Sequence, residues 1–78
     1  RVAVTFNRTP TGYTVSPYTN SNLYYIDGTS LSGNTIYVDV KFQPIPTNGS
    51  ATVTVTGILG YQTASRTFTV LYDSLIEP

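Results

Sequence analysis

The sequence contains no cysteine, histidine, tryptophan or methionine, and charged residues make up only 10% of its 78 positions. Without cysteine there can be no disulfide bond, and without both cysteine and histidine the common zinc sites are excluded. The same absences remove the usual nucleophile–base pairs of hydrolytic enzymes. We therefore expect a chain that is not an enzyme and that uses no metal and no cofactor.

Charge of either sign is also sparse, since four basic and four acidic residues give a formal net charge of zero. Binding of nucleic acid needs a basic face that neutralises phosphates, whereas Arg1, Arg8, Lys41 and Arg66 are scattered along the chain. No apolar run approaches the roughly 20 residues that span a bilayer. The sequence therefore predicts neither a nucleic-acid partner nor membrane insertion.

The length of 78 residues predicts one domain over residues 1–78, and the lack of an initiator methionine and a signal peptide predicts that it is excised from a larger protein. A chain of this size buries roughly 60% of the surface exposed by its unfolded form, so its stability is marginal. Partners that add stability would be neighbouring domains or another subunit. Fourteen threonines, seven tyrosines and low charge are typical of secreted and cell-surface β-domains, and we expect that location.

Apolar residues recur at every second position, which is the period of a half-buried β-strand. The segments with this alternation are 1–6, 13–16, 23–27, 35–42, 52–56 and 67–72. The alternating apolar positions give the expected core, which is Val4, Phe6, Val15, Ile36, Val38, Val40, Val53, Val55, Phe68 and Val70. No segment has helical periodicity, so the sequence predicts an all-β fold.

Segments rich in proline, glycine, serine and asparagine separate the expected strands. They are 7–12, 18–22, a turn at Asp27-Gly28 followed by a loop over 29–34, then 43–50 and 57–64. The connections over 7–12, 27–35 and 43–50 are long enough to cross between two sheets. About seven short strands joined in this way predict an antiparallel β-sandwich.

The segment GSATVTVTGILGYQTASRTFTV, residues 49–70, resembles the last hairpin of immunoglobulin (Ig)-like domains in prokaryotic surface and secreted proteins. Residues 57–61 replace the polar, acidic turn of those domains, through which some of them bind calcium. The resemblance implies an Ig-like sandwich that acts as a spacer, stalk or packing surface. We therefore expect a non-catalytic structural or interaction module.

The four carboxylates do not suggest a reactive pair. We expect Asp27 to cap backbone groups in its turn and Asp39 to form a solvated charge pair with Lys41 on one strand face. Asp73 and Glu77 lie in the C-terminal tail. No catalytic residue and no calcium site is predicted from these positions.

Exposed tyrosines suggest an alternative function, a carbohydrate-binding module, because sugar rings pack on aromatic faces. Alternation is expected to direct Tyr24 and Tyr37 away from Ile26 and Val38, and Tyr18 and Tyr61 fall in predicted loops. A platform forms only if these tyrosines gather on one face. The competing interpretation is that they are partly buried at the rim of the core.

Two further features concern modification and assembly. The tripeptides that begin at Asn7 and Asn48 fit the N-x-[ST] glycosylation pattern, and both lie in predicted loops. Threonine-rich strands without edge lysines could also accept a strand from another subunit. The chain could therefore be a subunit of a surface polymer that assembles through sheet edges.

Overall fold

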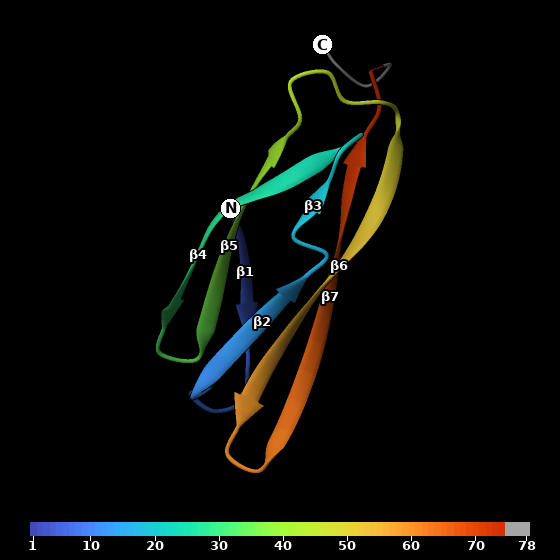
Figure 1. Ribbon diagram of the computed structural model, residues 1–78. Helices are drawn as coiled ribbons and strands as arrows, with labels where there is room; N and C mark the ends of the chain where they lie inside the picture. The colour runs from blue at the N-terminus through green and yellow to red at the C-terminus, as the bar shows by residue number, and fades with distance from the viewer. Residues whose placement is uncertain (75–78) are drawn as a thin grey trace.

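Seven strands form two antiparallel sheets in the computed structural model, which describes residues 1–74 (Figure 1). The four-stranded sheet has, in spatial order, β1 (Val2–Thr5), β5 (Thr35–Phe42), β4 (Tyr24–Ser32) and β3 (Thr19–Asn20). The three-stranded sheet has β2 (Gly12–Ser16), β6 (Gly49–Leu59) and β7 (Gln62–Tyr72). The predicted all-β, antiparallel, seven-stranded sandwich is confirmed. Residues 1–74 include no helix long and apolar enough to cross a membrane.

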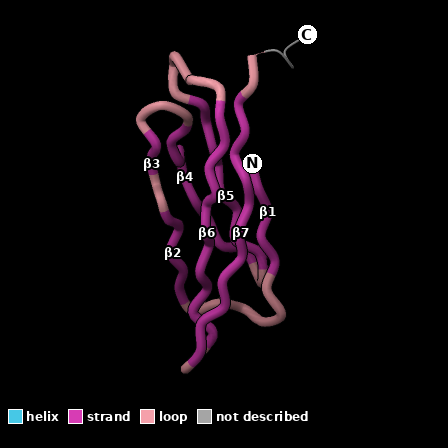
Figure 2. The backbone as a smooth tube through the Cα atoms, turned by 90° about the vertical axis from the view of Figure 1, so that its right-hand side faces the viewer, coloured by secondary structure: helices cyan, strands magenta, loops and turns pink. Residues whose placement is uncertain are grey.

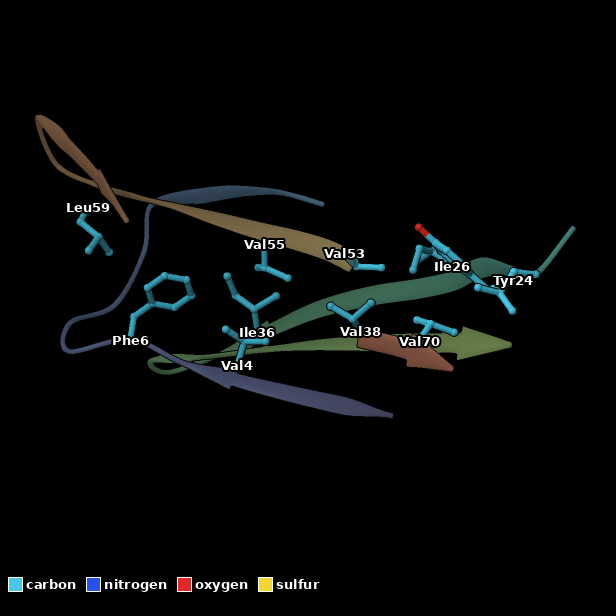
Figure 3. Close-up of a cluster of buried hydrophobic side chains, with 11 residues drawn as sticks. Val4, Phe6, Tyr24, Ile26, Ile36, Val38, Val53, Val55, Leu59 and Val70 are labelled. Carbon is cyan, nitrogen blue, oxygen red and sulfur yellow. The ribbon is translucent and has the colours of Figure 1, made fainter. Parts of the chain in front are cut away.

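The core lies between the inner faces of the two sheets, as the packed side chains in Figure 3 show. Its buried apolar residues are Val4, Phe6, Leu23, Tyr24, Ile26, Ile36, Val38, Val53, Val55, Leu59 and Val70. Of the predicted core, only Val15, Val40 and Phe68 are half-buried, because they lie at its margin and pack against it. Val15 belongs to an edge strand, and Val40 and Phe68 border an open side of the sandwich.

In β6 of the three-stranded sheet, buried and more exposed residues alternate as the sequence predicts. Val53 and Val55 are fully buried, and the residues between and beside them point to the outer face. Register places Thr52 opposite Thr69 and Thr54 opposite Thr67, so hydroxyl side chains cover that face. Branched threonine side chains suit a pleated surface in contact with water.

The segment Asp27-Gly28 is a β-bulge inside β4, so the predictions of a turn there and of a loop over 29–34 were wrong. Pairing with β5 shifts between Ile26 and Gly28, and β4 then continues to Ser32. One extra residue reverses the alternation. Before the bulge Ile26 points inward, and after it Thr29 lies opposite the buried Val38. Because the inward and outward positions exchange at the bulge, the second half of β4 does not continue the alternation of the first half and could not be predicted from it.

Two tight turns replace the long loops expected at 29–34 and 57–64. Ser32 pairs with Thr35 and Leu59 pairs with Gln62, so each hairpin closes with two residues. The first residue of each turn is a glycine with positive φ, 59° at Gly33 and 75° at Gly60, as in the type II′ turn that matches strand twist. Strands β6 and β7 therefore extend well beyond the predicted 52–56 and 67–72 (Figure 2).

Gly57 does not border a loop but lies inside β6, against the ring of Phe6. A Cβ at this position would stand 3.1 Å from two carbons of that ring. The residue without a side chain thus makes room for the largest side chain at this end of the core. Phe6 comes from the connection after β1, so the contact ties the start of the chain to the last hairpin.

The chain crosses between sheets in residues 6–11, 17–18 and 43–48. Two of these crossings fall in connections that the sequence predicted to cross. The third predicted crossing, 27–35, was wrong because the bulge and the tight turn keep that segment in one sheet. The crossing after Ser16 was missed, and the loop expected over 18–22 contains β3.

Ile36→Ala should lower the free energy of unfolding by about 2–5 kcal/mol, since Ile36 is fully buried and its truncation leaves a cavity. Urea unfolding followed by circular dichroism measures the loss. The matched control is Ile45→Ala, because Ile45 is 88% exposed and the same truncation should change the stability by no more than about 0.5 kcal/mol. Equal losses in the two variants would contradict the assigned core.

Candidate functional site

Tyr24 is fully buried, so the prediction that it is an exposed ligand contact was wrong. Its position two residues from Ile26 in one strand puts both side chains on the inner face, as Figure 3 shows. The Tyr24 hydroxyl donates a 2.6 Å hydrogen bond to the carbonyl oxygen of Pro17, and burial raises the pKa of Tyr24. Tyr24 therefore fixes the crossing between β2 and β3 from inside.

The other three predicted tyrosines lie on separate parts of the molecule. Tyr61 is fully exposed in the β6–β7 turn, and Tyr18 is half exposed in the crossing after β2, at the opposite end of that strand's pairing with β6. Tyr37 is half-buried on β5, in the other sheet. The structure does not bring them together into one aromatic face.

The outer face of the four-stranded sheet carries two ion pairs. Arg1 Nε donates to Asp39 Oδ1 at 2.9 Å, and its guanidinium lies 5.1 Å from the ring centre of Tyr37. Lys41 Nζ lies 3.4 Å from Asp27 Oδ2. The expected Asp39–Lys41 pair and the expected cap by Asp27 were wrong, because the bulge brings Asp27 to Lys41 and the start of the chain brings Arg1 to Asp39.

The hydrogen bond from Arg1 holds the pKa of Asp39 below its ordinary value, and the same bond raises the pKa of Arg1. Asp27 and Asp39 are thus each matched by a cation. Residues 1–74 contain no group of three histidine, cysteine, aspartate or glutamate side chains that could hold a metal ion. Glu77 lies outside the described residues. This face is a solvated charged surface on which Asp27 and Asp39 are each paired with a cation.

A groove of about 260 Å³ runs along the open side of the sandwich, between the two sheets. One wall comes from β1 and β5, and the other from β7. The residues that line it are mostly apolar, namely Val2, Val40, Phe42, Phe68, Val70 and Leu71, together with Arg1 and Thr69. Sequence reasoning did not predict this groove, because its walls come from three strands far apart in the chain.

The groove opens beside the part of β5 that β1 does not cover. Pairing of β1 with β5 begins at Val2 opposite Val38, so within residues 1–74 the part of β5 beyond Val38 has no strand beside it on that edge. Phe42 at the end of β5 is 46% exposed, and its ring meets that of Tyr72 edge-on, with centroids 5.2 Å apart. Leu71, which is also exposed, borders the same opening.

The two N-x-[ST] asparagines are both exposed. Asn7 lies in the β1–β2 connection, and Asn48 lies directly before β6. Asn48 Oδ1 accepts a 3.0 Å hydrogen bond from the backbone N–H of Ser74. Both sites are positioned where the sequence placed them, and their use as glycan acceptors stays a prediction.

No family model, no curated protein and no solved structure gave a significant match to this chain.

Asp39→Asn should reduce the sensitivity of the fold to acid. Because the folded-state pKa of Asp39 is lowered, the Arg1 pair stabilises the fold fully above the ordinary pKa of 3.8 and loses this effect as the pH falls through the folded value. Melting temperatures measured from pH 6 down to pH 2.5 should fall less steeply in the variant. The control is Asp27→Asn, which keeps the Arg1–Asp39 pair, so its melting temperature should fall with pH as steeply as that of the wild type. An equally reduced fall in both variants would contradict the role assigned to Asp39.

Proposed function

We propose that this chain is an Ig-like, non-catalytic structural and interaction module of a secreted or cell-surface protein. The order of its strands carries the proposal. Ig constant-type domains place strands A, B, E and D in one sheet and C, F and G in the other. Here β1-β5-β4 and β2-β6-β7 follow the orders B-E-D and C-F-G, with every neighbouring pair antiparallel.

The remaining strands fit the same scheme. In this correspondence β3 takes the place between C and D, and it pairs with the strand that corresponds to D. The strand that would correspond to A has no counterpart in residues 1–74. The segment 49–70, which resembles the last hairpin of prokaryotic Ig-like domains, coincides with β6 and β7, the counterparts of F and G.

The surface supports a mechanical or packing role. The described residues form an elongated body of 43 × 21 × 16 Å, with the β5–β6 connection and the β6–β7 turn at opposite ends of the long axis (Figure 1). One outer face is covered by hydroxyl groups and the other by paired charges. Such a body holds a fixed length, and its partners in this role are neighbouring domains or another subunit.

A distance measurement tests the mechanical part of the proposal. Because the sequence has no cysteine, spin labels attach only at the two cysteines that are introduced. Spin labels at Ile45→Cys, in the β5–β6 connection, and Tyr61→Cys, in the β6–β7 turn, should give one narrow distance distribution, because the two sheets form a single packed body. Double electron–electron resonance measures it. A broad distribution like that of the urea-unfolded control would overturn the structural role.

Location is tested separately on source cells. An antibody raised against the folded chain should label intact cells, since the proposal places the module on the outside or in secreted material. Permeabilised cells serve as the control for total protein. Labelling that appears only after permeabilisation, together with no protein in the medium, would contradict the location while leaving the structural role intact.

A further inference from the structure

The free edge of β7 is the longest open sheet edge in the described residues. β7 has eleven residues and pairs only with β6, whereas the edge strands β1, β2 and β3 have four, five and two. Its one charged residue is Arg66. A long edge strand with little charge presents unpaired backbone groups to any other strand, and natural proteins normally block such edges with lysine, proline or a covering element.

The hairpin geometry identifies the backbone groups that face outward. Leu59 and Gln62 close a two-residue turn, so the hydrogen-bonded pairs with β6 fall on the even-numbered residues of β7. The carbonyl of Ile58, opposite Thr63, agrees with this pattern because it accepts from Thr11 on the β2 side. The N–H and C=O groups of the odd-numbered residues of β7, from Thr63 to Leu71, therefore point away from the sheet.

The side chains along this edge favour a strand with the same sequence. Antiparallel pairing of β7 with a second β7, centred on Thr69, sets Phe68 opposite Val70 on the inner face and Thr67 opposite Leu71 on the outer face. Phe68 and Val70 belong to the wall of the apolar groove. The second strand would thus extend that wall and cover the exposed Leu71 and the open side of the groove.

The one charged residue of β7 is compatible with the antiparallel arrangement. Arg66 lies near the middle of β7 on the inner face, where its guanidinium lies 5.2 Å from the ring centre of Phe6. Two antiparallel copies place each Arg66 opposite Tyr72 of the second copy, one residue from its Asp73. The two Arg66 side chains are therefore kept apart, and no two like charges lie directly opposite each other in the new pair of strands.

We propose that the chain forms a symmetric homodimer by antiparallel pairing of β7 with β7 of a second copy, which joins the two three-stranded sheets into one six-stranded sheet. This deepens the interaction role proposed above by naming the partner, and it rests on that role. The dimer does not depend on the location of the protein or on its rigidity, so its failure leaves those two tests unaffected.

Sedimentation equilibrium of the full chain tests the dimer. The wild type should show a concentration-dependent dimer of twice its 8.5 kDa mass. Thr69→Lys puts two ammonium groups at the two-fold axis and should raise the dissociation constant at least tenfold. Thr52→Lys is the matched control, because Thr52 is exposed and lies opposite Thr69 on β6, a central strand whose backbone groups there pair with β7 or face away from the new edge. The dissociation constant of this variant should stay within about threefold of the wild-type value.

Amide hydrogen exchange identifies the edge that is used. The N–H groups of Thr67, Thr69 and Leu71 should be protected in the wild-type dimer and should exchange quickly in Thr69→Lys, while melting temperatures confirm that both lysine variants are folded. A wild type that stays monomeric at millimolar concentration overturns the proposal. So does a dimer that Thr69→Lys leaves intact, or one that Thr52→Lys disrupts equally, since each places the contact elsewhere.

Discussion

The fold depends on the burial of two apolar sheet faces against each other. Neither a three-stranded nor a four-stranded sheet keeps its apolar face out of water alone, and the chain has no disulfide bond to compensate. Ile36 and Val38 from one sheet and Val53 and Val55 from the other are therefore fully buried at the centre. Because the two apolar faces pack against each other, the hydroxyl groups and the ion pairs lie on the two outer faces of the sandwich.

Much of this architecture could be predicted from alternation. Strand β5 has the predicted bounds, and the inward residues of β6 were assigned correctly because nothing interrupts their period of two. The second half of β4 could not be found in this way, since the bulge at Asp27-Gly28 reverses its faces. The loop predicted over 57–64 is too long, because the positive φ of Gly60 lets two residues close the β6–β7 hairpin.

The candidate site was less predictable, for a different reason. The groove joins Val2 and Phe42 to Leu71, and nothing local in the sequence tells which edge strands lie side by side across a sandwich. Its one signal was the presence of apolar Phe42 and Leu71 at strand positions that remain in contact with water. Tyr24 was misassigned although its distance of two residues from the buried Ile26 gave the correct face.

The contact between Phe6 and Gly57 has a consequence for the kinetics of folding. Both tight hairpins join segments that are neighbours in the sequence, so they close at little entropic cost. The contact between Phe6 and Gly57 joins residues that are far apart in the sequence. The hairpins can therefore form early and independently. The ring of Phe6 can pack against Gly57 only after β1 has paired with β5. Docking of the N-terminal strand, a contact of high sequence separation, would then set the slow step of assembly.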